Sequence, residues 1–312
     1  MVFPSVASCT KEHRVSPSSA VSSAAPSDFS GLWVPLITPF RHDGAVDHAS
    51  LTALVRRLAP TGIAGFVVCG STGEAAALDE VEQLAVLATV AAAASALPRV
   101  MGISGYHLGK TLDWVRRLAD QDLCGLLVPA PSYIRPSQQG LLTWFTAIAD
   151  ASRVPLIVYD IPYRTGATLS LETLRALAAH PRIRALKDCG GDMGKTRALI
   201  ADGALQVLAG EDAQIFSTVA EGGAGAIAAS THVETAKFVQ VLRLIGEGKW
   251  AEARPVWQAL QPLIALLFAE PNPASIKAWL ADAGVIADGH LRAPMTPASD
   301  ALRERLRAAA QA

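Results

Sequence analysis

The sequence predicts an α/β fold, a (β/α)₈ TIM barrel followed by a C-terminal helical appendage. Eight short and almost wholly apolar segments recur along the chain, which is the pattern of parallel strands buried on both faces. Longer segments with helical periodicity alternate with them, as in a closed barrel of βα units. After about residue 249 the strand-like segments stop and only helical periodicity remains. On the pattern alone, an open doubly wound sheet is the alternative.

The expected strands follow an N-terminal stretch, residues 1–28, that is rich in Ser, Ala and Pro and that we interpret as a disordered tail. This stretch lacks the continuous apolar segment of a secretory signal, but its many serines and few acidic residues leave an organelle transit peptide as an alternative. The barrel is expected over residues 29–249. Its strands are predicted at residues 32–40, 65–70, 99–104, 125–130, 155–160, 183–188, 205–210 and 225–230.

Helical periodicity marks the segments between these strands. Asp79 and Ser170 each precede such a segment and are good N-cap residues. Beyond the barrel, residues 250–312 are predicted to be helical, with a break at Pro271 and Pro273. The clearest helical segments of the barrel are residues 48–59, 79–96, 110–120, 137–150, 170–180 and 235–248.

The composition excludes several classes of partner. The 312 residues, 51% of them hydrophobic, suffice for one large core, and a formal net charge of -1 gives no attraction for nucleic acid. No apolar segment is long enough to span a bilayer, so no membrane association is expected. The cysteines have no metal-binding spacing and fit reduced thiols in a cytoplasmic protein. They are Cys9, Cys69, Cys124 and Cys189.

The candidate site is sought where the strands of such a barrel end, because active sites lie at the carboxyl ends of the strands. The second predicted strand ends in Gly-Ser-Thr-Gly-Glu, residues 70–74. Its hydroxyls and backbone N–H groups could form a small cradle for an anion. The segment lacks the lysine and spacing of a nucleotide-binding P-loop, and a plain turn is equally consistent with it.

The fifth and sixth strands end in side chains that suit carbonyl chemistry. Tyr159 closes the fifth strand as either a packing aromatic or a catalytic phenol, and Arg164 follows as either a surface charge or a clamp for a carboxylate. Lys187 closes the sixth strand, where desolvation would lower its pKa and supply the neutral amine that attacks a carbonyl. The alternative is a structural lysine paired with a carboxylate such as Asp188.

Three further residues are expected near the mouth of the barrel, and each could be structural or functional. Tyr133 lies on a proline-stiffened loop after the fourth strand, where it could pack locally or carry protons. His232 follows the eighth strand and is expected to face the mouth. Cys189 could be a reactive thiol, but a small filler at the strand end is favoured.

The motifs together resemble the dihydrodipicolinate synthase / N-acetylneuraminate lyase family, from about Gly31 to about Thr296. Two of them, YIRPSQQG at 133–140 and EPNPASIKAWLADAG at 270–284 with PMTP at 294–297, are similar to the synthase branch. The motifs shared with the whole family are GSTGE at 70–74, YDIPYRTG at 159–166, LKDCGGD at 186–192 and AGED at 209–212.

The resemblance implies a role for each catalytic candidate. Lys187 would form an imine with pyruvate, and Tyr159 would donate and accept protons beside it. Ser71 and Tyr133 would complete a hydroxyl relay with Tyr159. In the family this second tyrosine reaches into a neighbouring subunit's site, so a homodimer or homotetramer is expected. The covalent imine replaces a cofactor, and no metal is expected.

The resemblance also implies the substrates. Thr72 with the adjoining backbone at Gly73 would hold the pyruvate carboxylate, and Ile227 would line the pyruvate site. Arg164 would bind the carboxylate of a second substrate, L-aspartate 4-semialdehyde. The implied product is 4-hydroxy-tetrahydrodipicolinate, on the route to diaminopimelate and lysine.

Departures from the family pattern leave alternatives open. Asp160 and His232 stand where the family usually has asparagine, and Ser71 replaces a threonine but keeps its hydroxyl. The first two motivate a second reading, an aldolase or dehydratase of the same family acting on another 2-keto acid. A third reading, a non-catalytic barrel that binds a keto acid, is disfavoured because Lys187 and Tyr159 are both present.

The positions that match the lysine-inhibitor site of feedback-sensitive members also depart from the family. That site must hold an α-ammonium and an α-carboxylate, and most of the groups that do so in the family are missing here. We therefore predict that lysine does not inhibit this protein. The positions are Glu80, Gln83, His107, Thr111 and Ser132.

Overall fold

The computed structural model describes residues 28–311. The predicted tail lies outside these residues apart from Asp28, whose carboxylate accepts hydrogen bonds from the Ser30 N–H (2.9 Å) and the Gln206 side chain (2.7 Å). The described chain therefore begins against the start of a barrel strand.

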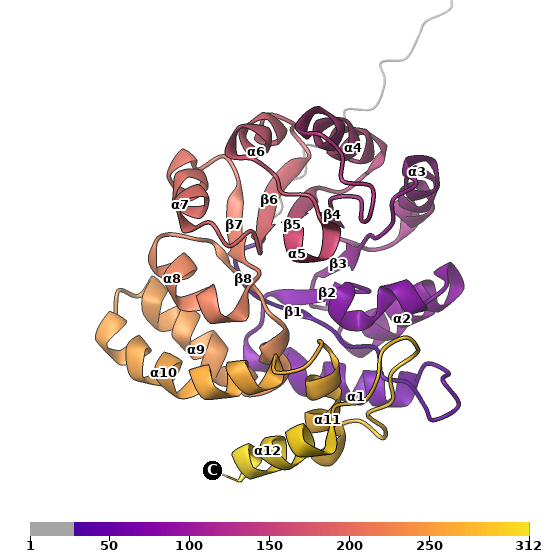
Figure 1. Ribbon diagram of the computed structural model, residues 1–312, viewed down its shortest axis with the longest axis vertical. Helices are drawn as coiled ribbons and strands as arrows, with labels where there is room; N and C mark the ends of the chain where they lie inside the picture. The colour runs from indigo at the N-terminus through magenta and orange to yellow at the C-terminus, as the bar shows by residue number, and fades with distance from the viewer. Residues whose placement is uncertain (1–27, 312) are drawn as a thin grey trace, which may run out of the picture.

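The strands of the described residues close into a parallel barrel in the order β1 to β8, with β8 paired to β1. Figure 1 shows these strands at the centre of a ring of helices. The predicted (β/α)₈ barrel is confirmed, and the open-sheet alternative is wrong. The strands are β1 (Gly31–Pro35), β2 (Gly65–Val68), β3 (Arg99–Gly102), β4 (Gly125–Pro129), β5 (Leu156–Asp160), β6 (Ile183–Asp188), β7 (Gln206–Ala209) and β8 (Gly225–Ile227).

Most observed strands are shorter than the predicted ones, because apolar residues continue into the loops at the strand ends. The largest difference concerns β1, which was expected over residues 32–40 and ends at Pro35. Beyond it, the N–H of Ile37 donates to Nε2 of His232 (3.1 Å) rather than to a neighbouring strand. A side chain thus replaces the sheet as the partner of the backbone.

At least one helix follows each strand on the outside of the barrel. The carboxylate of Asp79 accepts from the Glu82 N–H and the Glu82 carboxylate accepts from the Asp79 N–H, while Ser170 caps its helix through the Thr173 N–H. Both predicted N-caps are confirmed. The barrel helices are α1 (His48–Leu58), α2 (Glu80–Ala93), α3 (Leu108–Arg117), α4 (Gln138–Ala151), α5 (Pro162–Thr165), α6 (Leu171–Ala178), α7 (Met193–Asp202), α8 (Ile215–Ala220) and α9 (Thr235–Gly246).

Short 3₁₀ turns connect several of these elements. Two of them, η2 and η3, form most of the loop after β2, and η6 follows β8. The 3₁₀ turns are η1 (Ala59–Thr61), η2 (Ser71–Gly73), η3 (Ala75–Ala77), η4 (Leu118–Asp120), η5 (Asp212–Gln214) and η6 (Ala229–His232).

Apolar side chains fill both the inside of the barrel and the layer between strands and helices. At the amino-terminal end of the barrel, Phe29 and Trp33 pack together, and the Trp33 indole donates to the Phe29 carbonyl (2.8 Å). Above them, alternate strand residues point inward and leave no open pore. This inner set contains Val67, Val100, Leu127, Ile157, Tyr159, Ala185, Leu208 and Ile227.

Three helices follow the barrel: α10 (Trp250–Leu267), α11 (Ala274–Asp282) and α12 (Asp300–Ala310). The predicted break at Pro271 and Pro273 falls between α10 and α11 and is confirmed. In Figure 1, α10 runs beside α9, while α11 and α12 extend past α1 towards the C-terminus. None of the helices in residues 28–311 has both the length and the apolar character that a membrane span needs.

Candidate active site

Tyr159 and Lys187 lie side by side at the carboxyl ends of β5 and β6. The strand register pairs their Cα positions, and both side chains follow the inward-pointing positions Ile157 and Ala185. The Lys187 Nζ atom lies 4.3 Å from the centre of the Tyr159 ring. The structure therefore brings together the two residues that the motifs singled out.

The environment of Lys187 favours a neutral amine. The residue is only 4% exposed, and burial lowers the pKa of its ammonium. Asp188 bonds elsewhere, accepting from the Gly190 N–H (2.8 Å) and the Thr196 hydroxyl (2.5 Å). The ion pair with Asp188 that was the structural alternative is therefore not formed, and burial without that partner favours the neutral form of the Lys187 amine.

Tyr159 is held as a protonated phenol. Burial, and then the neighbouring Cys189 and Tyr163, raise its pKa well above the ordinary value. A hydrogen bond with the Ser71 side chain works in the opposite direction. Tyr159 and Ser71 line the same cavity, so the two hydroxyls lie at one end of the barrel.

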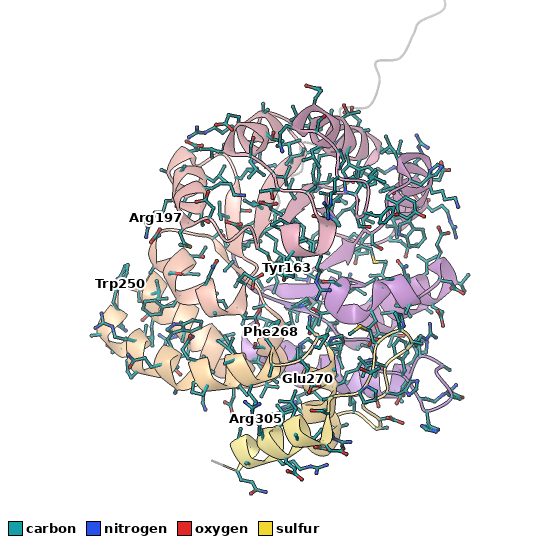
Figure 2. The ribbon with its side chains drawn as sticks, in the orientation of Figure 1. Tyr163, Arg197, Trp250, Phe268, Glu270 and Arg305 are labelled. Atoms are coloured by element: carbon teal, nitrogen blue, oxygen red, sulfur yellow. The ribbon has the colours of Figure 1, made fainter. Side chains whose placement is uncertain are left out.

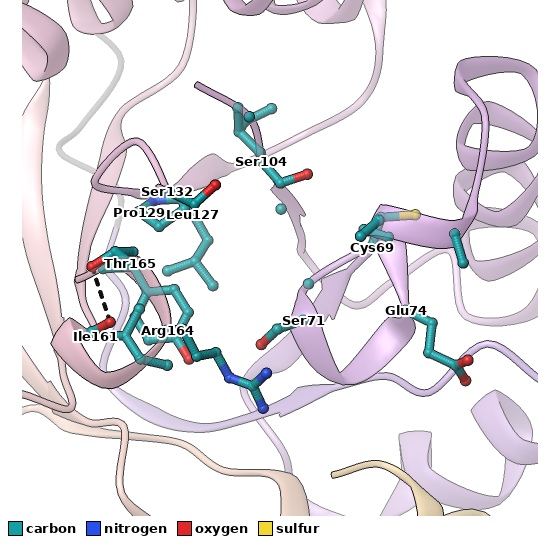
Figure 3. A pocket seen from close by; sticks show the side chains of 18 of the residues that line it. Cys69, Ser71, Glu74, Ser104, Leu127, Pro129, Ser132, Ile161, Arg164 and Thr165 are labelled. Atoms are coloured by element: carbon teal, nitrogen blue, oxygen red, sulfur yellow. Dashed lines mark hydrogen bonds between the residues drawn. The ribbon is translucent and has the colours of Figure 1, made fainter. Parts of the chain in front are cut away.

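A cavity of about 390 Å³ opens above this pair. Ser71 and Arg164 extend into it from opposite sides in Figure 3, and Tyr159 contributes to its wall. Lys187 does not line the cavity itself but lies against the ring of Tyr159. A small carbonyl compound in this cavity would have an arginine on one side and hydroxyls on the other.

The loop after β2 has little freedom. The Gly70 carbonyl accepts from the N–H groups of Gly73 (3.0 Å) and Ala75 (3.4 Å), and the Thr38 hydroxyl donates to the Gly73 carbonyl (2.7 Å). A Cβ at Gly73 would lie 2.8 Å from the Leu36 carbonyl oxygen, so glycine is required there. These contacts fix the backbone of the loop and so position Ser71 and Thr72, which precede Gly73.

Arg164 stands on α5, the short helix after β5. Pro162 begins this helix, and the Thr165 hydroxyl donates to the Ile161 carbonyl (3.1 Å), the contact dashed in Figure 3. The Arg164 guanidinium lies 5.9 Å from the ring of Tyr163, which is near the middle of the view in Figure 2. The guanidinium is thereby directed over the mouth of the barrel.

Two expected site residues lie apart from this group. Tyr133 is 89% exposed, adopts a left-handed backbone (φ 73°) and does not line the cavity of its own chain. Ile227 is fully buried at the end of β8, inside the barrel. Tyr133 thus lies outside the cavity of its own chain, and Ile227 lies beneath the mouth of the barrel.

The expectation that His232 faces the mouth is wrong. The ring is fully buried: Nε2 accepts from the Ile37 N–H (3.1 Å) and Nδ1 lies 2.8 Å from the Ala229 carbonyl oxygen. Burial lowers its pKa to about 4, so the ring is neutral. Both ring nitrogens form hydrogen bonds with backbone groups, because the 3₁₀ turn after β8 directs the side chain towards the end of β1.

Asp160 also points away from the cavity. Its carboxylate pairs with Lys195 (2.5 Å) on α7 and accepts from the Leu169 N–H (3.3 Å). Successive strand residues face opposite sides of a sheet, so a residue that follows the inward Tyr159 must face the helices. Asp160, which stands where the family usually has asparagine, therefore has its charged partner, Lys195, outside the cavity.

The comparisons with known proteins identify the family. The model of the Dihydrodipicolinate synthetase family matches residues 28–312. The chain belongs to this family. The resemblance drawn from the motifs is thereby confirmed, together with the lyase class of enzyme that it implied.

The chain is similar over most of its length to curated family members. It is 37% identical over 279 residues to 4-hydroxy-tetrahydrodipicolinate synthase 2 of Clostridium acetobutylicum, covering 88% of this chain and 97% of that protein. With the 4-hydroxy-tetrahydrodipicolinate synthase of Haloarcula marismortui it shares 34% identity over 283 residues, 90% of this chain and 92% of the relative.

Solved structures of the family have the same fold. The chloride-inhibited dihydrodipicolinate synthase from Acinetobacter baumannii, complexed with pyruvate, matches with a TM-score of 0.87 and 31% identity over 90% of this chain and 98% of its own. A monomeric dihydrodipicolinate synthase variant matches with a TM-score of 0.87 and 28% identity, covering 91% and 96%.

Sequence reasoning missed the contribution of the C-terminal region to the cavity. Asn272 and Arg292 line it together with Pro273 and Met295. These residues belong to the EPNP and PMTP motifs or lie next to them. The presence of both motifs in the pattern of the synthase branch was the one sign in the sequence that this region contributes to the site. Nothing in the local sequence shows that they meet the loop after β2.

Glu211 is a second residue at the mouth that was not singled out. One of its carboxylate oxygens is buried without a hydrogen-bond partner among the described residues. Burial, and then the charge of Glu211, raise the pKa of the Cys189 thiol well above its ordinary value. Cys189 therefore stays protonated, which fits the favoured reading of a filler.

Proposed function

We propose that this protein is a class I lyase that condenses pyruvate with L-aspartate 4-semialdehyde to 4-hydroxy-tetrahydrodipicolinate, in the cytoplasm. The single observation that carries the proposal is the buried Lys187 amine 4.3 Å from the Tyr159 ring at the carboxyl end of the barrel. Relatives at 34–37% identity bear the name of this activity, and a structural neighbour is complexed with pyruvate.

The chemistry follows from the protonation states. The neutral Lys187 amine adds to the keto carbon of pyruvate and water leaves, which gives an imine. The imine nitrogen accepts electron density when the methyl group loses a proton, and the resulting enamine carbon adds to the aldehyde. The amine of the second substrate then displaces Lys187 and closes the ring. Tyr159 donates and accepts the protons of these steps, with Ser71 beside it.

Binding of the two carboxylates is assigned to opposite sides of the cavity. Thr72 and the backbone beside it would hold pyruvate, above Ile227; the N–H of Gly73, expected to take part, already donates to the Gly70 carbonyl (3.0 Å). In the part of the chain that the structure describes, the N–H groups of Ser71 and Thr72 have no acceptor, so they are available to an anion. Arg164 would take the carboxylate of the aldehyde as a forked, permanently charged donor.

The alternative function, that of an aldolase or dehydratase of the same family acting on another 2-keto acid, is no longer supported. It rested on Asp160 and His232, and neither residue lines the cavity. We therefore retain the aldehyde that Arg164 favours. We also propose that residues 29–249 carry the chemistry and that residues 250–312 support it, in a homodimer or homotetramer that brings Tyr133 of one subunit to its neighbour's site.

Borohydride trapping tests the imine. The wild-type protein incubated with pyruvate and borohydride should gain one pyruvate-derived adduct in its intact mass, and Lys187→Ala should gain none. The matched control is Lys110→Ala, a lysine on α3 outside the cavity, which should be labelled like the wild type. Absence of an adduct on the wild type, or equal labelling of Lys187→Ala, would remove the mechanism.

A panel of aldehydes then tests the second substrate. L-Aspartate 4-semialdehyde should turn over, and Arg164→Ala should reduce kcat/KM for it by roughly 10- to 100-fold, the worth of a charge-assisted hydrogen bond, without preventing the pyruvate adduct. A strong adduct with no turnover of this aldehyde would keep the lyase mechanism and discard the substrate.

Insensitivity to lysine belongs to the same proposal. Glu80, Gln83, His107 and Thr111 line a cavity of about 310 Å³, but each already uses a side-chain polar atom within the chain, Thr111 through the His107 carbonyl. The pairs join Glu80 to Arg117, Gln83 to backbone carbonyls, and His107 to the Lys110 N–H. Initial rates should therefore be unchanged by lysine at millimolar concentration, and a clear fall in rate would contradict this.

A further inference from the structure

The C-terminal region holds the loop that carries Ser71 and Thr72. Lys277 on α11 is fully buried and pairs with Glu74 at 2.5 Å, while its ammonium also donates to the His290 carbonyl (2.9 Å). The Arg292 N–H donates to the other oxygen of Glu74 (3.2 Å). The end of the loop is thus fixed by residues that lie 200 positions or more further along the chain.

Within this arrangement, one contact reaches a residue of the site itself. The Asn272 side chain donates from Nδ2 to the Thr72 hydroxyl oxygen at 2.9 Å. The Asn272 residue lines the cavity, and its Oδ1 atom is buried without a partner among the described residues. The amide therefore stands between the C-terminal region and the mouth of the barrel.

The direction of this hydrogen bond determines what Thr72 can do. A hydroxyl has one hydrogen to donate, and the Thr72 oxygen is already used as an acceptor by Asn272. Its hydrogen has no acceptor in residues 28–311, and Thr72 is only 3% exposed, so water is largely kept away. A carboxylate is the group that would use such a hydrogen best, because hydrogen bonds to a charged acceptor are the strong ones.

We propose that Asn272 is a positioning residue for pyruvate: its N–H occupies the Thr72 oxygen and leaves the Thr72 hydrogen for the pyruvate carboxylate. The inference rests on the proposed function, since Thr72 takes its substrate from there. Asn272 acts through Thr72, so it should affect the affinity for pyruvate rather than the formation of the imine bond.

The test measures borohydride trapping at increasing pyruvate concentration, which yields a half-saturating concentration and a maximal trapping rate. Asn272→Ala should raise the half-saturating concentration about tenfold and leave the maximal rate within about twofold. Asn272→Asp, with the same shape, should raise it at least as much, because a carboxylate accepts the Thr72 hydrogen instead of donating to its oxygen. Glu270→Gln, bonded to Ser299 on the same connection, is the matched control and should behave as the wild type.

A double-substitution cycle decides whether the effect passes through Thr72. Thr72→Val should itself raise the half-saturating concentration, and adding Asn272→Ala to it should change nothing further. An equal rise in both backgrounds, or no rise with either single variant at Asn272, would overturn the proposal. Thermal unfolding shows which variants are folded, and the isosteric Asn272→Asp carries the test if Asn272→Ala is not.

Failure of the proposed function has a separate signature. If the wild type forms no pyruvate adduct, the proposed function is lost before any variant is compared. If the wild type forms the adduct and the Asn272 variants saturate as it does, the proposed function stands and the role of Asn272 is lost.

Discussion

At the scale of single residues, the chemistry depends on burial more than on charged neighbours. Desolvation lowers the pKa of Lys187 and raises that of Tyr159, so each group is driven towards its neutral form. An amine without its extra proton and a phenol that keeps its own are the pair that imine formation needs. In the proposed mechanism, one apolar barrel end thus prepares both the nucleophile and the acid.

Removal of the Tyr159 hydroxyl should slow turnover, because the proposed mechanism needs this group to donate and accept protons. Tyr159→Phe deletes only the hydroxyl, so turnover should fall by roughly 10²- to 10⁴-fold, the usual worth of a general acid–base group. Tyr106→Phe is the matched control, since Tyr106 is 60% exposed and lies outside the main cavity. Steady-state kinetics of both variants make the comparison, and near-normal turnover by Tyr159→Phe would argue against its role.

The residues show what a sequence can and cannot tell about a site. Lys187 and Tyr159 were predictable because a polar side chain that closes an apolar strand is conspicuous and strand ends gather at one face. Their exact neighbourhood was not, since it depends on the register between β5 and β6. The bond from Asn272 to Thr72 spans 200 residues and leaves no local trace in either segment.

At the scale of elements, the strand ends are fixed by side chains from the outer layer. Lys195 and Thr196 on α7 bind the carboxylates of Asp160 and Asp188, the last residues of β5 and β6. Those carboxylates directly follow Tyr159 and Lys187, so one helix holds the ends of the two strands that carry these residues. The strand segments were predictable from their apolar runs, whereas this pairing required knowledge of which way each residue faces.

The junction between β1 and η6 has a consequence for stability in acid. The pKa of His232 is about 4 in the folded protein against an ordinary 6.5, so the unfolded chain binds more protons between these values. Stability is therefore fully present above pH 6.5 and is lost as the pH falls towards 4. From about pH 7 to about pH 5 this residue should reduce the free energy of unfolding by about 2 kcal/mol.

Urea unfolding of the wild type and His232→Asn at both pH values measures this effect. Asparagine keeps an acceptor for the Ile37 N–H but does not titrate, so the variant should lose less stability on acidification. Comparing slopes with pH removes any constant cost of the smaller side chain. Equal slopes in the two proteins would rule out His232 as the origin.

At the scale of the whole molecule, the cavity is lined by Ser71 and Tyr159 of the proposed relay but not by Tyr133, which we also propose for it. Tyr133 is exposed on a loop beside Ile134, itself 53% exposed. An exposed aromatic side chain on a left-handed residue, next to an exposed aliphatic one, fits a surface that another subunit covers. The composition could suggest such contacts, but only the structure shows that Tyr133 leaves its own cavity.

A hybrid of two inactive variants tests this sharing. Lys187→Ala and Tyr133→Phe, co-expressed with different tags and purified through both, would combine an intact lysine and an intact Tyr133 in one of the two sites of a hybrid dimer. If Tyr133 acts in the neighbouring subunit, specific activity should rise to as much as about half of the wild type. Activity no higher than that of the parent variants would place Tyr133 in its own subunit or outside the chemistry.

The pairing of Glu74 with Lys277 bears on the order in which the protein is made. The ribosome synthesises every strand and helix of the barrel before it synthesises α11, and until α11 emerges the Glu74 carboxylate has no Lys277 ammonium to pair with. Leaving one member of a buried pair alone typically costs about 3–5 kcal/mol, so the loop after β2 should remain unsettled in the nascent chain. The barrel is built in chain order, but the site at its mouth can be completed only by nearly the last segment to emerge.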